Sequence, residues 1–451
     1  MKSILKHLKI ISLSFVLMVP GFFAEAENPA FPLKVSANKR YFVDQKGISF
    51  LYNADTGWLI FYKLTTEESR AYLTTRKKQG FNAIQTQLAM FVNHKNRNGK
   101  SIFDGDNDFS RPNEAFHNHI LEVIHIADSL GLMIVLSQPW VGCCGESYGG
   151  SPDKPIGMNG TEKNRNYGKY LGKKFAGCTN LFWIIGGDND PRGDLNEIEA
   201  FAEGLRETAP AFQLLTYHAS ATHSSTDIFQ HAKWLGFSMV YTYWKDKWND
   251  NPVKKRNLDQ MPEVYEVSLK EYNKSFVLPF VLGESQYEGF SGNDNGTPEI
   301  IRRQFYWVML SGGAGHAYGS QIWNFPANWH DILKWPGAQQ VQYANNFFNA
   351  INWWQLVPDQ KHDLVLNGFG TYSKTDYVTA ALTDDKKTAA LYMFKSVPVL
   401  VDLSQLKGSK ITAQWFNPRT GEYTGGGNHI SGKVEFLPPT NEDWALVLKA
   451  D

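Results

Sequence analysis

The sequence feature that most constrains the fold is a regular alternation of short apolar runs with longer amphipathic segments. Eight runs have the length and the β-branched or aromatic content of buried strands, and they cover residues 49–54, 82–88, 132–137, 181–186, 212–217, 235–241, 279–283 and 314–318. Helical patterning follows each run, at residues 65–79, 113–131, 161–177, 194–208, 226–233, 261–272, 298–311 and 336–352. Eight strand–helix units in succession predict an α/β protein of the (β/α)8 TIM-barrel class.

Two further observations favour a barrel over a doubly wound open sheet. An open sheet that binds a dinucleotide carries a glycine-rich turn after its first strand, and no such turn follows residues 49–54. Sequence signals for helix starts also lie at the beginning of two of the predicted helices. The stretch 65–68 reads Thr-Thr-Glu-Glu, which resembles a capping box, and Thr297 precedes a proline at the first helical position.

The chain outside the barrel divides into two parts. Residues 1–26 place three lysines before an apolar stretch and an Ala-Glu-Ala cleavage site, so we expect a signal peptide and an exported protein, periplasmic or secreted. The apolar stretch is too short for a membrane span. The barrel is then expected over residues 27–360. Residues 361–451 carry short strand-like runs separated by turns, with 425–428 among the turns, and predict a small C-terminal all-β sandwich domain.

Composition excludes some classes of partner. The 45 basic residues balance the 45 acidic ones, so no basic surface indicates nucleic-acid binding. Aromatic residues make up 14% of the chain, a share that suits sugar-stacking platforms as well as a large core. Cys143, Cys144 and Cys178 are an odd number of cysteines, which leaves at least one without an intramolecular partner and excludes a fold built on disulfides.

Two carboxylates follow the fourth strand-like run. The apolar residues 181–185 end at two glycines, which allow a close approach to the backbone, and Asp188 and Asp190 come next. In a parallel α/β fold, catalytic groups lie at this end of the strands. The alternative is a turn whose carboxylate caps the next helix. A further carboxylate, Glu284, directly follows the seventh run and favours a catalytic pair.

The remaining strand ends supply side chains that suit a sugar ring. Amide, imidazole, carboxylate and phenol groups bind hydroxyls, and indoles stack on the apolar ring face. The candidates for substrate binding are Asp55, Trp58, Gln87, Trp140, His218, Tyr241, Tyr243, Trp244, Tyr318 and Trp323. The tryptophans are as compatible with core packing as with stacking. We expect no metal, because no second His or Cys stands at ligand spacing from His218. We expect no cofactor, because glycoside cleavage by two carboxyl groups needs none.

A glycosidase needs two carboxyl groups. One protonates the leaving oxygen, and the other attacks the anomeric carbon or activates water. Asp188 and Glu284 meet this need, and Asp190, which precedes a proline, is the rival to Asp188. A separation of about 5–5.5 Å between the carboxyls favours retention of configuration, and a wider gap favours inversion.

Three stretches of the chain together resemble one family. Residues 53–58 (Asn-Ala-Asp-Thr-Gly-Trp), residues 182–190 and the pair Gly283-Glu284 resemble the apiosidase-like glycoside hydrolases. Residues 414–421 and 443–446 resemble the domain, named as collagen-binding, that follows the barrel in that family. The resemblance implies cleavage of an apiosyl linkage in the plant pectic polysaccharide rhamnogalacturonan II. It also implies that Asp188 is the acid and Glu284 the nucleophile or base.

Two other functions remain open from the sequence. A glycosidase of the same fold could act on another plant or host glycan, since no feature of the sequence identifies apiose itself. A non-catalytic polysaccharide-binding protein is the second alternative, and it would have no need of two carboxyl groups that face each other. In all three cases the expected partner is an oligosaccharide or polysaccharide.

Overall fold

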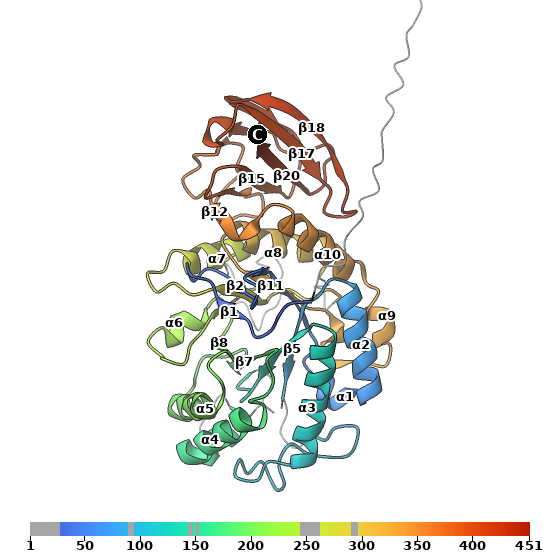
Figure 1. Ribbon diagram of the computed structural model, residues 1–451, viewed down its shortest axis with the longest axis vertical. Coiled ribbons are helices and arrows are strands. Elements are labelled where there is room, and N and C mark those ends of the chain that lie inside the picture. The colour runs from blue at the N-terminus through green and yellow to red at the C-terminus, as the bar shows by residue number, and fades with distance from the viewer. Residues whose placement is uncertain (1–27, 89–93, 143–147, 150–152, 244–261, 290–295) are drawn as a thin grey trace, which may run out of the picture.

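The computed structural model describes residues 28–88, 94–142, 148–149, 153–243, 262–289 and 296–451. It consists of a barrel of parallel strands surrounded by helices and, above it in the view of Figure 1, a C-terminal antiparallel β unit. The expected signal peptide, Cys143, Cys144 and Trp244 lie outside the described residues. No helix in the described ranges is both long and apolar enough to cross a bilayer.

An eight-stranded sheet forms the predicted barrel. Its neighbours follow the order β8-β7-β6-β5-β4-β11-β10-β9, and every pair in it is parallel. The strands are β4 (Tyr52–Thr56), β5 (Ala83–Gln87), β6 (Met133–Ser137), β7 (Leu181–Gly186), β8 (Leu215–His218), β9 (Ser238–Tyr241), β10 (Phe280–Glu284) and β11 (Gly315–Tyr318). All eight lie at predicted strand positions, within a few residues.

A serine hydroxyl helps to close the barrel between β8 and β9. Leu215 forms a parallel bridge with Leu235, just ahead of β9. The Ser225 hydroxyl donates to the Tyr217 carbonyl at 2.6 Å and accepts from the Met239 amide at 2.8 Å. Since a buried backbone group needs a partner, this side chain replaces ladder hydrogen bonds that the two strands do not make to each other.

Helices surround the barrel, and most begin where the sequence predicts. Thr65 and Glu68 form a complete capping box at the start of α2, and the Thr297 side chain caps α8 ahead of a proline. The α-helices are α1 (Ile60–Lys63), α2 (Thr66–Lys78), α3 (Glu114–Ser129), α4 (Pro155–Lys174), α5 (Leu195–Thr208), α6 (Ser225–Phe229), α7 (Val264–Tyr272), α8 (Pro298–Leu310), α9 (Trp329–Ile332) and α10 (Pro336–Asn349). A short 3-10 helix, η3 (Gln321–Asn324), follows β11.

The N-terminal end of the barrel is plugged. A three-stranded antiparallel sheet of β1 (Lys34–Val35), β2 (Phe42–Val43) and β3 (Ser49–Phe50) carries the buried Phe42. The Phe42 ring packs on Phe182 and on Phe237, with centroids 5.6 Å apart in both cases. With this end filled by aromatic rings, the C-terminal strand ends remain as the place for a site.

The C-terminal unit contains two antiparallel sheets, as predicted. One has the order β12-β14-β15-β20-β17-β18 and the other β13-β16-β19. Their strands are β12 (Leu356–Pro358), β13 (Val365–Asn367), β14 (Thr379–Thr383), β15 (Thr388–Met393), β16 (Val399–Asp402), β17 (Lys410–Phe416), β18 (Tyr423–Ile430), β19 (Lys433–Phe436) and β20 (Trp444–Ala450). Because β12 already pairs with β14, this sheet begins a few residues before the boundary expected at 360/361, which stays a prediction.

The expectation of a turn at residues 425–428 is wrong. These residues lie inside β18, which pairs along β17 with a register shift between Ala413 and Gln414. Gly427 has φ +96°, and glycine adopts such an angle where a strand is bulged. A mostly exposed edge strand buries little apolar surface, so it lacks the hydrophobic alternation by which strands are recognised.

Aromatic stacking joins the two domains. Tyr306 on α8 stacks on Tyr392 of β15 with ring centroids 4.6 Å apart, and Phe347 on α10 meets Phe416 of β17 at 5.0 Å. Figure 1 shows α8 and α10 lying between the barrel and the β unit. The helix that follows the Glu284 strand is therefore held on one side by the barrel and on the other by the C-terminal domain.

Candidate active site

The turn after β7 gives Asp188 an unusual backbone. Gly186, Gly187 and Asp188 have φ of +79°, +153° and +51°, and Asp is one of the few non-glycine residues that tolerate the left-handed region. A Cβ on Gly187 would come within 2.0 Å of the Trp140 ring, so only glycine allows that ring to lie against the turn. The two glycines at the end of the buried strand thus position both Asp188 and Trp140.

A register irregularity directs Glu284 into the barrel mouth. On β10 the pairing with β9 shifts between Leu282 and Glu284, where a regular strand would continue its alternation. Gly283 faces Met239 so closely that a Cβ would lie 2.3 Å from its side chain. The Glu284 side chain consequently meets Asp188, which follows β7, and His218, which ends β8, and only 6% of the residue is exposed.

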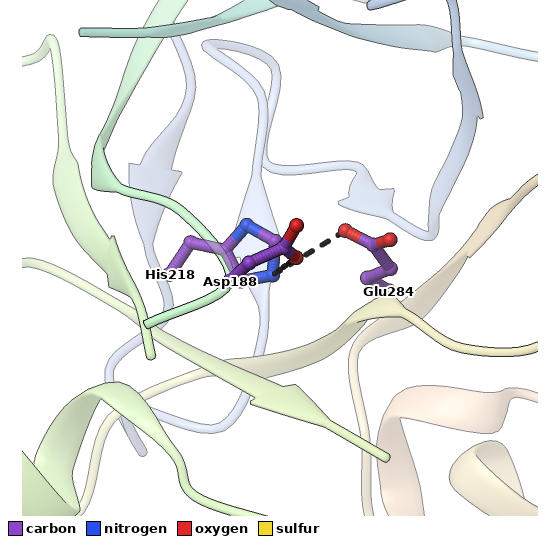
Figure 2. Close-up of side chains that lie close together, drawn as sticks. All are labelled: Asp188, His218 and Glu284. Atoms are coloured by element: carbon purple, nitrogen blue, oxygen red, sulfur yellow. Dashed lines mark ion pairs between the residues drawn. The ribbon is translucent and has the colours of Figure 1, made fainter. Parts of the chain in front are cut away.

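Asp188, Glu284 and His218 form the centre of the site (Figure 2). The His218 Nε2 atom lies 3.4 Å from Glu284 Oε2 and 3.8 Å from Asp188 Oδ1. One oxygen of each carboxylate and this nitrogen all lie within 4.8 Å of one another. The sequence prediction that the strand-four and strand-seven carboxylates face each other is therefore met by the geometry.

Each carboxylate accepts a hydrogen bond from a tyrosine at the end of β9. The Tyr241 hydroxyl donates to Asp188 Oδ1, and the Tyr243 hydroxyl donates to Glu284 Oε1, both at 3.2 Å. The two tyrosine rings contact each other edge to face with centroids 5.2 Å apart. The predicted binding residues Tyr241 and Tyr243 thus lie within the site and contact the carboxylates themselves.

Burial determines the protonation of Glu284 and His218. Burial, and then the facing Asp188 carboxylate, raise the pKa of Glu284 well above its usual value, although hydrogen bonds from Tyr287 and Tyr243 act in the opposite direction. Burial alone lowers the pKa of His218 to about 3. At neutral pH the imidazole is therefore uncharged, and the two carboxyl groups compete for protons as a coupled pair.

Indole rings and an amide line the mouth around the pair. Trp58 stacks over His218 with ring planes 16° apart, and Trp140 contacts Trp58 at 6.0 Å and His218 at 5.9 Å. Gln87 lies on the inward-facing side of β5. Both polar atoms of its amide, and the Trp140 Nε1, are buried without a hydrogen-bond partner among the described residues. Unsatisfied buried donors and acceptors in a mouth are the groups that a hydroxylated ligand would bind.

Two predicted binding residues lie on the wrong side of the barrel wall. Asp55 accepts from the Tyr72 hydroxyl at 2.5 Å and from Arg76 Nε at 2.6 Å, so it faces helix α2. Tyr318, which pairs with Asp55 in register, donates to Glu288 Oε2 at 2.6 Å and also lies beside Arg76. Successive side chains on a strand point to opposite faces, and these two belong to the helix-facing set. In this structure neither side chain faces the barrel mouth, where the sequence analysis places substrate binding.

The structure also separates the two aspartates of the β7 turn. Asp190 Oδ2 contacts His223 Nδ1 at 2.7 Å, and Asp190 Oδ1 accepts from the Ser220 amide at 3.1 Å. Asp188 is the one that faces Glu284. Trp323 is half-buried in η3, and its carbonyl accepts from the amide of Leu59, the residue after Trp58.

One residue of the site carries no signal in the sequence. Tyr287, three residues after Glu284, accepts a hydrogen bond from Trp58 Nε1 at 2.6 Å and lies at the Glu284 carboxylate. It belongs to a loop that follows β10, and loop tyrosines have no distinguishing spacing. Only the contact with Trp58, 229 positions away in the chain, identifies it.

The three central groups also have the donor types of a cation site. Two carboxylate oxygens and an imidazole nitrogen within 4.8 Å could bind a divalent metal ion. A histidine that binds metal usually donates its other ring N–H to a carbonyl or carboxylate. Among the described residues, His218 Nδ1 has no such partner. The donor set therefore fits a metal only in part.

The barrel, the facing carboxylates and the aromatic mouth define a fold and site of the glycoside hydrolase type. Solved structures with the same fold include one described as "Glycoside hydrolase", with a TM-score of 0.81 and 23% identity over 94% of this chain and 99% of that one. Another is a glycoside hydrolase family 5 protein from Bacteroides vulgatus, with a TM-score of 0.82 and 22% identity over 93% and 94% of the two chains. No curated protein matches the chain.

Family models identify the chain more closely. Residues 36–355 match the model described as "Apiosidase-like, catalytic domain", and residues 357–449 match the "Putative collagen-binding domain of a collagenase". The first match covers more than half of the 451 residues, so the protein belongs to the apiosidase-like family. Both parts of the sequence resemblance are confirmed.

Proposed function

We propose that this protein is a glycoside hydrolase that cleaves an apiosyl linkage in the pectic polysaccharide rhamnogalacturonan II. The observation that carries the proposal is the facing pair of buried Glu284 and half-buried Asp188 at the barrel mouth, with oxygens within 4.8 Å of each other. Membership in the apiosidase-like family supports the substrate. A protein that only binds glycans gains nothing from two carboxyls held face to face, since each raises the free energy of ionising the other.

The carboxyl separation supports a retaining mechanism. Retaining glycosidases place their two carboxyl groups about 5–5.5 Å apart, whereas inverting enzymes leave a wider gap for water. In this mechanism Asp188 protonates the leaving oxygen while Glu284 attacks the anomeric carbon and forms a glycosyl–enzyme ester. Asp188 then removes a proton from water, and the resulting hydroxide equivalent breaks the ester and regenerates Glu284.

Two features of the site bear on the assignment of acid and nucleophile. Burial raises the pKa of Glu284, which on its own would make Glu284 the proton carrier. Hydrogen-bond donors gather at the same carboxylate, however, because the Tyr243 and Tyr287 hydroxyls are both directed at it. Donors stabilise a carboxylate and its transition state, so they favour Glu284 as the nucleophile. Asp188, with a side chain 19% exposed, lies nearer to solvent, where a leaving group departs.

The proposal for substrate binding uses the described residues of the mouth. Gln87 and neutral His218 would bind ring hydroxyls, and Trp58, Trp140 and Trp323 would cover the apolar face of the sugar. Export through a signal peptide at residues 1–26 completes the proposal, since polysaccharide substrates lie outside the cytoplasm.

The test is product release from rhamnogalacturonan II and a panel of other glycans by wild type and Glu284→Gln. Release of apiose-containing product by wild type alone supports the proposal. Release only from another glycan, again dependent on Glu284, retains the mechanism and rejects the substrate. Activity of Glu284→Gln equal to wild type, or no cleavage of any glycan by wild type, rejects the glycosidase. A parallel assay in EDTA should leave the rate unchanged, and a loss that Mg²⁺, Ca²⁺ or Zn²⁺ restores would show that the central cluster binds a metal.

A further inference from the structure

Tyr287 is fixed in place at the site by contacts on several sides. The residue is 6% exposed. A Cβ on Gly319 would come within 2.3 Å of its ring, so the glycine lets the ring lie flat against the backbone after β11. At the other end of the ring, the hydroxyl oxygen accepts a hydrogen bond from Trp58 Nε1 at 2.6 Å. A side chain packed on its face and bonded at its tip has one orientation.

The partner of this hydrogen bond determines where the Tyr287 proton points. An indole N–H can only donate, so the Tyr287 oxygen is the acceptor in the contact with Trp58. The phenolic proton must then point away from Trp58. The Glu284 carboxylate and the Thr56 hydroxyl both lie within hydrogen-bonding reach of the Tyr287 hydroxyl, and the carboxylate is the stronger acceptor. Charge-assisted bonds of this kind are stronger than neutral ones, and donation from Trp58 polarises the hydroxyl further.

The surroundings of Glu284 indicate what the hydrogen bond from Tyr287 does. Burial and the Asp188 carboxylate both disfavour the ionised form of Glu284, which a nucleophile needs. Trp58 meanwhile stacks on His218, whose Nε2 lies 3.4 Å from Glu284 Oε2. A single indole therefore contacts both the ring beside Glu284 and the tyrosine that donates to it.

We propose that Tyr287 is a positioning residue that, with Trp58 as its donor, orients the Glu284 carboxylate and favours its ionised form for attack. The inference rests on the proposed function in which Glu284 is the nucleophile. It assigns Trp58 a second role besides contact with sugar, namely to set the direction of the Tyr287 proton. It also explains how a carboxylate in so buried a position remains reactive.

The test is the pH dependence of kcat/KM for Tyr287→Phe, which removes one hydroxyl and retains the ring. Loss of a hydrogen bond to the charged form raises the pKa of Glu284, so the acidic limb of the profile should move up by about one pH unit. The value of kcat/KM at the optimum should fall on the order of tenfold or more. Trp58→Phe should move the limb in the same direction by less, and the double variant should move it no further than Tyr287→Phe alone, because Trp58 acts on Glu284 through Tyr287.

Tyr392→Phe is the matched control. It removes another buried tyrosine hydroxyl that donates to a carboxylate, Asp443 in the C-terminal domain, at 3.0 Å. Both variants lose a buried hydrogen bond and some thermal stability, but only Tyr287→Phe should shift the acidic limb. An unshifted limb in Tyr287→Phe overturns the inference, as does an equal shift in Tyr392→Phe.

A second measurement is independent of substrate. Carbodiimide modifies protonated carboxyls, and peptide mass spectrometry across a pH series reports the pKa of Glu284 directly. Tyr287→Phe should extend Glu284 labelling to higher pH than in wild type. If Glu284→Gln keeps full activity, the proposed function fails, whereas an unchanged labelling profile in Tyr287→Phe rejects the Tyr287 inference whatever the substrate.

Discussion

Arg302 and Asp443 form a buried two-point ion pair across the domain interface. Arg302 Nε lies 2.9 Å from Asp443 Oδ2, and Nη2 lies 2.8 Å from Oδ1. Arg419 Nη1 and the Tyr392 hydroxyl bind the same carboxylate at 2.9 Å and 3.0 Å. Since Arg302 stands on α8, the helix that follows the Glu284 strand, this carboxylate fastens the C-terminal domain to the catalytic barrel.

Asp443→Asn should destabilise the protein strongly. The substitution leaves two arginines facing a neutral amide, one of them with a side chain only 6% exposed, at a cost of about 3 kcal/mol. Urea unfolding followed by fluorescence should show a lower midpoint. The exposed pair Lys334–Asp331 supplies the control, since Asp331→Asn should cost less than about 1 kcal/mol. Equal midpoints for Asp443→Asn and wild type would contradict a structural role for the contact.

The ion pair of Arg302 and Asp443 also predicts how the stability of the fold changes with pH. Burial would raise the pKa of Asp443, but its hydrogen bonds and charge pairing with Arg302 and Arg419 outweigh burial and lower it. A carboxyl whose pKa is lowered by folding contributes stability that is present above its unfolded-state pKa and is lost as the pH falls. In wild type this contribution should disappear below about pH 4, and in Asp443→Asn it should be absent throughout.

Buried neutral histidines should make the protein less stable in mild acid. Burial lowers the pKa of His117 to about 4 and of His218 and His316 to about 3. The unfolded chain therefore binds protons that the folded chain does not, between about pH 3 and 6.5, and stability rises with pH across that window. His316 stacks on Phe305 outside the site, so His316→Phe tests the effect. The slope of unfolding free energy between pH 4 and 6 should fall by about 1.4 kcal/mol per pH unit, and an unchanged slope would contradict it.

Gly187→Ala should damage the site more than the fold. The new Cβ would lie 2.0 Å from the Trp140 ring, and φ of +153° is unfavourable for alanine, so the Asp188 turn and the indole must separate. We expect kcat/KM to fall at least on the order of tenfold, because displacements of about 1 Å at a catalytic group have effects of this size or larger. The control is Gly177→Ala, where the added Cβ would meet nothing within 4 Å. Equal activity of both variants would show that the close packing of Trp140 is unimportant.

The architecture could be predicted because every barrel strand is buried on both faces. A fully buried strand such as β7 leaves a continuous apolar run with a clear end, and in a barrel that end is where Asp188 must lie. The pair of Asp188 and Glu284 followed from this reasoning. Strand β18 was missed for the opposite reason, since it is an exposed, glycine-rich edge that buries little apolar surface.

Side-chain direction was the weakest part of the sequence prediction. Asp55 and Tyr318 stand at the correct strand ends, but a difference of one residue decides between the barrel mouth and the helix layer. No pattern of residues indicated that Arg76 on α2 would bind Asp55. Tyr287 could not be assigned to the site from the sequence, because its contact with Trp58 forms only in the folded chain.

The most direct test of the central claim compares Asp188→Asn and Glu284→Gln on aryl glycosides that differ in leaving group. If Asp188 is the acid, Asp188→Asn should retain cleavage of an activated leaving group that needs no proton, and should lose at least about a hundredfold on a poor one. Added azide should then yield a glycosyl azide with the configuration of the substrate, since a retaining enzyme forms a glycosyl–Glu284 ester. Glu284→Gln should be inactive on both substrates. Activity of Glu284→Gln on the activated substrate, together with an Asp188→Asn variant inactive on both, would reverse the roles, and wild-type rates in either variant would contradict the carboxyl pair itself.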